Sequence, residues 1–176
     1  IINVNQLKEA ITMHPTHEEL DVKVAVLTVS DTRTVEDDRG GKIIQDLLHE
    51  AGFTLANYDI IKDEPRLLAE RMKQWHTDLA ISAIIITGGT GFTPRDQTYD
   101  TITPLFDKEM TGFGELFRML SYDEIGPRAM FSRATAGSIG QTAVYLLPGS
   151  TNAVKLGMTK LILPTVQHFI GELKRV

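Results

Sequence analysis

Apolar runs alternate with amphipathic stretches in the first half of the chain, and this alternation predicts strands separated by helices. Residues 22–30 and 81–87 are mostly apolar and rich in β-branched side chains, which is typical of strands buried on both faces of a parallel sheet. Residues 53–61 form a third candidate strand. Between these runs, the apolar positions of residues 43–51 and 64–78 have helical spacing, so two helices are expected there.

The second half is less regular, but it contains patterns of both kinds. The expected elements are helices at residues 98–106, 112–121 and 151–173, and strands at residues 134–138 and 142–147. Residues 139–141 have a central glycine and predict a tight turn between the two strands. Pro164 lacks a backbone N–H group and is expected to interrupt the last helix. Strands that alternate with helices favour an α/β fold with a parallel sheet and right-handed crossovers.

Length and composition are those of one globular domain. The chain has 176 residues, which fits a single domain of the common size of about 100–200 residues. A hydrophobic fraction of 42% and a charged fraction of 23% are ordinary for such a domain. Residues 1–21 are weakly patterned, so we expect an N-terminal arm there and one domain at residues 22–176.

Charge and residue usage exclude several classes of function. The net charge of -5 disfavours general nucleic-acid binding, because the phosphate backbone is bound by clustered Lys and Arg. The absence of cysteine excludes disulfides, thiolate metal sites and cysteine nucleophiles. No apolar run approaches the length of about 20 residues that spans a membrane, and no secretory signal is recognised. We therefore expect a cytoplasmic protein that binds neither nucleic acid nor membranes.

The strongest candidate for chemistry is Thr-Gly-Gly-Thr-Gly-Phe-Thr-Pro-Arg-Asp at residues 87–96. In an open parallel sheet, ligands bind beyond the carboxyl ends of the strands, and this stretch follows a buried strand. Its glycines let the backbone approach a ligand and direct N–H groups at an anion. Arg95 offers a guanidinium for phosphate, and Asp96 can hold a divalent cation or accept a proton. The candidate ligand contacts are Thr87, Gly88, Gly89, Thr90, Gly91 and Arg95. The alternative is a tight turn closed by an Arg–Asp pair.

Two common nucleotide motifs are absent from this loop. No Gly-Lys-Ser/Thr follows, so it is not a Walker A loop. Gly89 and Gly91 lack the third glycine and the later acidic residue of the dinucleotide fingerprint. The usual ATPase and dehydrogenase interpretations therefore lose their main support.

Three shorter stretches are weaker candidates. Gly114 and Glu115 lie in Gly-Phe-Gly-Glu-Leu-Phe-Arg at residues 112–118, which opens either an anion site or simply a helix. Ser132 and Arg133 suit a phosphate, although a surface Ser-Arg pair usually has no such role. The last stretch is Leu-Pro-Gly-Ser at residues 147–150, where Gly149 and Ser150 can cap a helix and hold an anion at once.

These four stretches in this order resemble the molybdopterin-binding family that includes MoaB, MogA and the G domains of gephyrin-type proteins. The resemblance runs from about residue 22 to the end of the chain. It implies a three-layer α/β/α sandwich with a mostly parallel sheet and a trimeric core. It also implies an enzyme that transfers AMP from Mg-ATP to the terminal phosphate of molybdopterin and releases pyrophosphate.

The resemblance also implies roles for individual residues. Asp63 and Asp96 match the acidic positions of the family and are expected to be catalytic and to position Mg²⁺. The expected substrate contacts are Thr87, Gly88, Gly89, Thr90, Gly91, Arg95, Gly114, Glu115, Ser132, Arg133, Gly149 and Ser150. The expected nucleotide contacts are Ser30, Asp31, Asp38, Arg39, Gly40 and Gly41.

The arm at residues 1–21 resembles the MoaB branch, in which such an arm is associated with hexamers built from two trimers. Expected partners are molybdopterin, ATP, further copies of the chain and other proteins of molybdenum-cofactor biosynthesis. The rival interpretation is a non-catalytic molybdopterin carrier or scaffold. Retention of both Asp63 and Asp96 favours the enzyme, because binding an anion gains nothing from nearby carboxylates without a metal.

Overall fold

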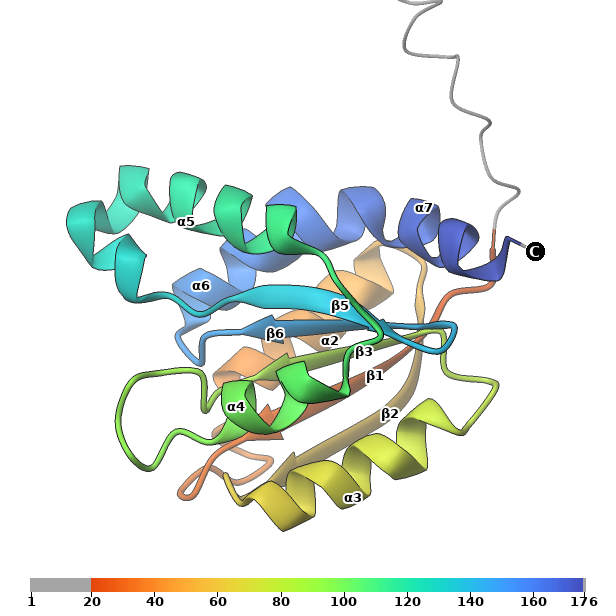
Figure 1. Ribbon diagram of the computed structural model, residues 1–176, viewed down its shortest axis with the longest axis horizontal. Helices are drawn as coiled ribbons and strands as arrows, with labels where there is room; N and C mark the ends of the chain where they lie inside the picture. Colours follow the sequence, from red (N-terminus) through yellow and green to blue (C-terminus); the bar gives the residue numbers. More distant parts are fainter. Residues whose placement is uncertain (1–19, 176) are drawn as a thin grey trace, which may run out of the picture.

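The computed structural model describes residues 20–175 and shows a three-layer α/β/α sandwich around one sheet (Figure 1). Residues 1–19 of the expected N-terminal arm lie outside the described residues. The strands are β1 (Lys23–Val29), β2 (Thr54–Ile61), β3 (Ala83–Thr87), β4 (Lys108–Glu109), β5 (Thr135–Ile139) and β6 (Thr142–Leu147). The helices are α2 (Arg39–Glu50), α3 (Pro65–His76), α4 (Thr98–Ile102), α5 (Thr111–Ile125), α6 (Thr151–Leu156) and α7 (Leu163–Lys174). Shorter helical segments are η1 (Thr103–Leu105), η2 (Gly126–Phe131) and η3 (Gly157–Ile162).

The sheet confirms the expected mostly parallel topology. Its strand order is β2-β1-β3-β6-β5-β4. The neighbours from β2 to β6 run parallel, whereas β5 is antiparallel to both β6 and β4. The turn between β5 and β6 falls where it was expected, and Gly140 has a φ of 57° there, a left-handed conformation that favours glycine. The two-residue strand β4 was not predicted, because it is too short to show an alternating pattern.

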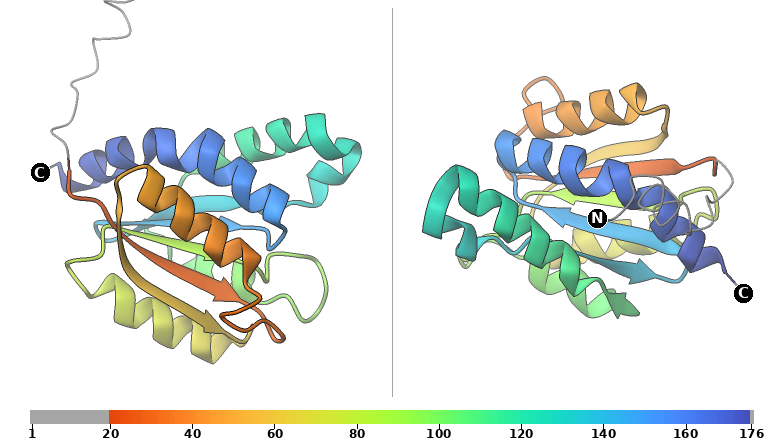
Figure 2. Two further views of the ribbon diagram at one scale, coloured as in Figure 1. Left: turned by 180° about the vertical axis from the view of Figure 1, so that it is seen from behind. Right: turned by 90° about the horizontal axis from the view of Figure 1, so that it is seen from above.

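Successive residues of the central strands enter two separate cores, one on each face of the sheet. In β1, Val24 and Val26 belong to the core that includes residues of α2, α5 and α7. Ala25 and Leu27 belong to the core that includes residues of α3 and α4. Figure 2 shows α5, α7 and α2 side by side over one face, with α3 on the other. Because helices cover both faces, the strands are apolar on both sides, which explains their continuous apolar runs.

The early start of α2 and the position of the interruption in the last helix both have local physical reasons. Helix α2 begins at Arg39, before the expected residue 43, because the Asp38 carboxylate caps it by accepting a hydrogen bond from the Gly41 N–H at 3.0 Å. The interruption expected near Pro164 lies just before it, where η3 forms a wider, π-type turn. Such a turn accommodates a proline, whose ring would clash with the carbonyl one turn earlier in a regular α-helix.

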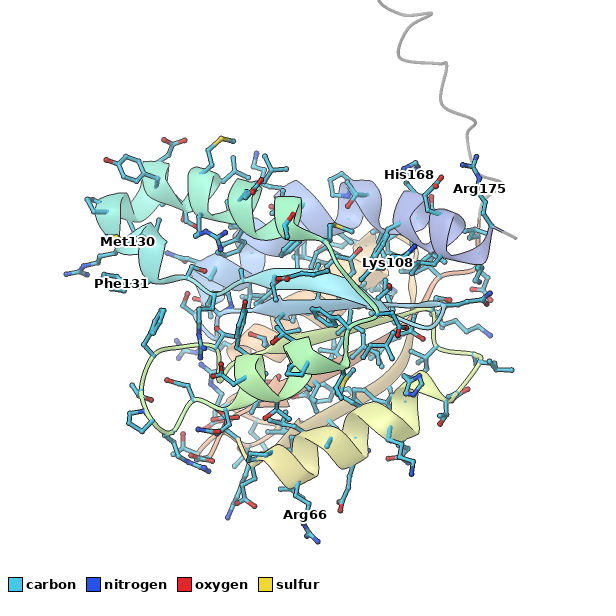
Figure 3. All side chains as sticks on the ribbon, in the orientation of Figure 1. Arg66, Lys108, Met130, Phe131, His168 and Arg175 are labelled. Carbon is cyan, nitrogen blue, oxygen red and sulfur yellow. The ribbon has the colours of Figure 1, made fainter. Side chains whose placement is uncertain are left out.

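The outer surface of α5 and η2 carries several exposed apolar side chains beside charged ones. The exposed apolar side chains there are Leu116, Met119, Tyr122, Ile125, Met130 and Phe131. Figure 3 shows Met130 and Phe131 together at one end of the molecule. No helix within residues 20–175 is long and apolar enough to cross a membrane. Exposed apolar surfaces of this kind are typical of contact surfaces, whereas self-association itself stays a prediction of the resemblance.

Candidate functional site

The site lies where the direction of the chain across the sheet reverses. From β1 the chain crosses to β2 on one side, and it later returns to β3 on the other side. The loops that follow β1 and β3 therefore diverge, and ligands bind in such a crevice in open α/β sheets. A cavity of about 430 Å³ opens there, and we call it the first cavity. It is lined by Val29, Ser30, Thr32, Arg33, Gly88, Gly89, Thr90, Gly91, Asp96, Phe131, Ser132, Arg133, Pro148 and Gly149.

The glycine-rich loop after β3 lies directly against β1 (Figure 1). Gly88 has a φ of 102°, and a Cβ there would lie 2.2 Å from the carbonyl oxygen of Val29. Only glycine permits this close approach. Thr87, the last residue of β3, is fully buried and donates a hydrogen bond from Oγ1 to the carbonyl of Pro148 at 3.1 Å. The first cavity is thus lined by Gly88, Gly89, Thr90 and Gly91, whereas Thr87 does not line it and instead links the end of β3 to Pro148.

Asp63, the first residue expected to hold Mg²⁺, lies behind this loop and does not line the first cavity. Its Oδ1 accepts a hydrogen bond from Thr98 Oγ1 at 3.0 Å, and its Oδ2 accepts one from the Gln97 N–H at 3.1 Å. Only 5% of Asp63 is exposed, and burial raises the pKa of its carboxyl. Each oxygen thus accepts one hydrogen bond, and together they fix the end of the loop and the start of α4. This position supports a role in shaping the loop rather than in holding a metal.

Asp96, the second acidic residue, does line the first cavity. Its Oδ2 accepts hydrogen bonds from the N–H and Oγ1 of Thr93, at 3.0 Å and 2.5 Å. These contacts fix the carboxylate and leave Oδ1 available. Within residues 20–175, no group of three or more His, Cys, Asp or Glu side chains has the geometry of a metal site. A cation at Asp96 would therefore need further ligands from a bound substrate.

Arg95, expected to bind phosphate, is instead paired within the protein. Its Nε and Nη2 donate hydrogen bonds to the two carboxylate oxygens of Asp31, at 2.6 Å and 2.5 Å. Its Nη1 donates to the carbonyl oxygen of Asp63 at 2.8 Å. The bidentate pair ties the loop after β3 to the loop after β1. Arg95 does not line the first cavity, so its position does not support the expected phosphate contact.

The Asp31–Arg95 pair leads to a pH-dependent prediction. The hydrogen bond from Arg95 lowers the pKa of Asp31 below its ordinary value of 3.8. A lowered folded-state pKa stabilises the fold above pH 3.8, and this contribution is lost as the pH falls through the folded-state pKa. In Asp31→Asn, the free energy of unfolding by urea should lie below that of the wild type at about pH 7 and approach it at about pH 3. An equal difference at both pH values would contradict this role of the pair.

Arg133 holds the loop from the opposite side. Its Nε and Nη2 donate hydrogen bonds to the carbonyl oxygens of Thr90 and Gly91, at 2.9 Å and 2.5 Å. Its Nη1 contacts the Asp100 carboxylate at 2.9 Å and 3.0 Å. The guanidinium also stacks on the rings of Phe92 and Tyr99, with distances to the ring centroids of 5.0 Å and 4.6 Å. Arg133 lines the first cavity, but most of its donors are already used in fixing the loop.

A second cavity of about 440 Å³ lies beyond the ends of β1 and β2. It is lined by Ser30, Asp31, Arg33, Thr34, Val35, Glu36, Tyr58, Asp59, Ile60, Ile61 and Lys62. Two of the expected nucleotide contacts line it, namely Ser30, which also lines the first cavity, and Asp31. Arg39, Gly40 and Gly41 instead form the first turn of α2 and line neither cavity.

Asp38, the remaining expected nucleotide contact, is buried and also lines neither cavity. Its Oδ2 accepts hydrogen bonds from Thr28 Oγ1 at 2.5 Å and from the Tyr58 hydroxyl at 2.7 Å, while its Oδ1 caps α2. Burial and the hydrogen bond to Asp38 raise the pKa of Tyr58, so the tyrosine remains a donor. Asp38 is therefore a structural residue, and its position does not support the expected nucleotide contact.

Three further expected substrate contacts do not line the first cavity, namely Gly114, Glu115 and Ser150. Gly114 packs in α5 so closely that a Cβ would lie 2.7 Å from the carbonyl of Ala134, and its neighbour Glu115 is exposed. Neither of them lines either cavity. Ser150 caps α6 by accepting a hydrogen bond from the Ala153 N–H at 3.3 Å. Its neighbour Gly149 does reach the first cavity, as does Ser132.

Arg33 lines both cavities and was missed at the sequence level. Its Nη2 donates a hydrogen bond to the carbonyl of Gly149 at 3.1 Å. The signal for it was present, because Arg33 follows the end of β1 by a few residues, at the ligand-binding edge of the sheet.

The fold and the site define an α/β domain with a glycine-rich ligand loop at the carboxyl edge of its sheet. The sequence model of the family described as "Probable molybdopterin binding domain" matches residues 25–168. The chain therefore belongs to this family, which confirms the resemblance seen in the sequence.

Individual relatives agree with this assignment. The chain is 50% identical over 155 residues to the protein of Bacillus subtilis (strain 168) named molybdenum cofactor biosynthesis protein B, covering 88% of this chain and 91% of the relative. A crystal structure of a molybdenum cofactor biosynthesis protein B is similar with a TM-score of 0.86 and 44% identity, covering 89% of this chain and 98% of the other. The structure of the tungsten cofactor synthesizing protein MoaB from Pyrococcus furiosus has a TM-score of 0.79 at 37% identity, with 88% and 98% covered.

Proposed function

We propose that this protein acts in molybdenum-cofactor biosynthesis, where it binds molybdopterin and transfers AMP to it from Mg-ATP. One observation carries the proposal. Two cavities of about 430 Å³ and 440 Å³ lie next to each other at the ligand-binding edge of the sheet and share Ser30 and Arg33. Adjoining cavities of similar size suit a reaction that brings two substrates together. Membership of the molybdopterin-binding family supports the choice of substrate.

The first cavity has the features that a phosphorylated pterin requires. The backbone of Gly88 to Gly91 approaches it and can offer N–H groups to a phosphate. Phe131 lines the cavity with 62% of its surface exposed, and it contacts Phe92 edge-on at 6.2 Å between ring centroids. An exposed aromatic ring suits stacking on a planar pterin. We therefore place molybdopterin in the first cavity and ATP in the second.

The reaction is an in-line displacement at the α-phosphorus of ATP. A terminal phosphate oxygen of molybdopterin forms a bond to the α-phosphorus, and the bond from this phosphorus to the bridging oxygen of pyrophosphate breaks. The attacking phosphate is already an anion, so no strong general base is needed. Catalysis then consists of placing the two phosphates and neutralising their charge.

Mg²⁺ is part of the proposal as the partner of ATP. It usually binds one or two carboxylates together with substrate phosphates, and it neutralises charge on the phosphate oxygens. Asp96 keeps Oδ1 available, but it lines the first cavity and not the second, so Mg²⁺ at Asp96 would have to bind where the phosphates of the two substrates meet. Asp63 is buried and lines neither cavity, so we assign it to positioning the loop.

A non-catalytic molybdopterin carrier is the second candidate. It is favoured by the finding that, within residues 20–175, Asp96 is the sole carboxylate among the residues that line the first cavity. Turnover of molybdopterin with Mg-ATP separates the two candidates. We expect release of pyrophosphate that depends on molybdopterin. Molybdopterin that binds tightly without release of pyrophosphate would contradict the enzyme and support the carrier. A cytoplasmic location and partnership with other biosynthetic proteins stay predictions.

A further inference from the structure

Arg33 separates the two cavities and lines both of them. It lies in the loop between β1 and α2, and 32% of its side chain is exposed. Its backbone N–H donates to Ser30 Oγ at 3.2 Å, which fixes the loop. A group bound at Arg33 would therefore lie at the boundary between the pterin and the nucleotide.

The other cationic side chains around the cavities are already paired within the protein or line only one of the two cavities. Arg133 lines the first cavity, but its guanidinium is bonded to two carbonyls and to the Asp100 carboxylate. Arg95 is paired with Asp31. Lys62 lines the second cavity alone. Among the described residues, Arg33 is thus the cation that both cavities share.

Within the protein, the guanidinium of Arg33 has one hydrogen bond and one long ion pair. Its Nη2 donates to the Gly149 carbonyl at 3.1 Å, and its Nη1 lies 3.9 Å from Asp38 Oδ1. Asp38 itself already accepts three shorter hydrogen bonds from Thr28, Tyr58 and Gly41. An arginine has five N–H donors, so several of them remain for a ligand. Its planar fork matches the oxygens of a phosphate.

We propose that Arg33 binds the phosphoryl groups between which AMP is transferred, contacting both the terminal phosphate of molybdopterin and the α-phosphate of ATP. This inference rests on the proposed function and adds a residue that the resemblance did not supply. Two anionic phosphates repel each other when they approach within bonding distance. A fixed cation between the two cavities offsets that repulsion where the new bond forms. Arg33 thus takes the role that the sequence suggested for Arg95.

The test measures binding of molybdopterin and of ATP separately by titration calorimetry. Arg33→Met removes the charge and the fork, while Arg33→Lys keeps the charge. Lys62→Met removes a cation that lines the second cavity alone. Arg66→Met removes an exposed cation on α3 that lines neither cavity and points into solvent in Figure 3. Thermal unfolding of each variant shows whether its fold is intact.

A contact with both phosphates predicts a distinctive pattern. Arg33→Met should lower the affinity for molybdopterin and the affinity for ATP by about tenfold to 100-fold each. This is the factor expected for losing a hydrogen bond between charged groups. Arg33→Lys should retain part of both affinities. Lys62→Met should lower the affinity for ATP alone, and Arg66→Met should change neither affinity.

Each other outcome overturns a defined part of the argument. Unchanged binding of both ligands to Arg33→Met, or weakened binding of only one, would overturn the shared role of Arg33. If Arg33→Met does not fold, the affinities of Arg33→Lys for molybdopterin and ATP are measured instead. Wild-type affinity of Arg33→Lys for both ligands would overturn the requirement for a guanidinium at this position. Failure of the wild type to bind ATP would instead overturn the proposed adenylyl transfer.

Discussion

Replacement of Asp96 by asparagine is expected to lower turnover by about 100-fold or more, a loss typical of removing a group that stabilises charge in the transition state. The amide has the same shape and can still accept a hydrogen bond from Thr93, so the loop should keep its conformation. It carries no negative charge, however, and amides bind Mg²⁺ more weakly than carboxylates do. Molybdopterin should therefore still bind, while release of pyrophosphate should almost cease.

The matched control is Asp46→Asn, which removes an exposed carboxylate from α2 that pairs with Lys42. It should leave turnover unchanged, which would show that the loss of one negative charge alone has no effect. Turnover at the wild-type rate in Asp96→Asn would refute the assignment of Asp96. Loss of molybdopterin binding in the same variant would show that Asp96 shapes the cavity instead.

Replacement of Asp38 by alanine should have the largest effect on stability, lowering the free energy of unfolding by about 3–5 kcal/mol. Loss of a helix cap costs about 1 kcal/mol. A buried donor left without a partner costs roughly 1–3 kcal/mol more, and the buried Thr28 hydroxyl would lose its acceptor. The half-buried Tyr58 hydroxyl would lose its acceptor as well, at a smaller cost because water can reach it. The contributions add because one buried carboxylate serves β1, β2 and α2 together.

Urea unfolding of Asp38→Ala and Asp38→Asn measures this effect. The asparagine variant keeps one acceptor for the Gly41 N–H and should lose less stability than the alanine variant. Asp37→Ala is the neighbouring control, because Asp37 is exposed and should contribute much less. A loss below about 1 kcal/mol in Asp38→Ala would contradict the structural role and reopen the nucleotide assignment.

The fold could be predicted in large part because its signals are local. The apolar runs of β1 and β3 reflect burial on both faces, and the turn at Gly140 needs only its own residues. The start of α2 was misplaced because the Arg-Gly-Gly stretch at residues 39–41 looks like a loop. Its helical conformation depends on Asp38, whose partners Thr28 and Tyr58 lie on two strands.

The site was predicted less completely because its charges pair over long distances in the sequence. Arg95 looks like a phosphate ligand beside a glycine loop, yet its partner Asp31 lies 64 residues away. Arg133 likewise bonds to Asp100 and to carbonyls of the loop. A sequence shows which charged residues follow strands, but it does not show which of them are already neutralised. Arg33 became the better candidate only once those partners were known.

The glycine loop is held in place by hydrogen bonds of Asp63, Arg95 and Arg133, and this limits how the family can change during evolution. These residues secure the loop to neighbouring strands and helices, so natural selection for a folded protein alone would retain them. A descendant that lost its chemistry would keep most of the motif, since discarding it would cost stability. Divergence in activity should accordingly be sought at groups that the fold itself uses least, such as Oδ1 of Asp96 and the remaining N–H donors of Arg33.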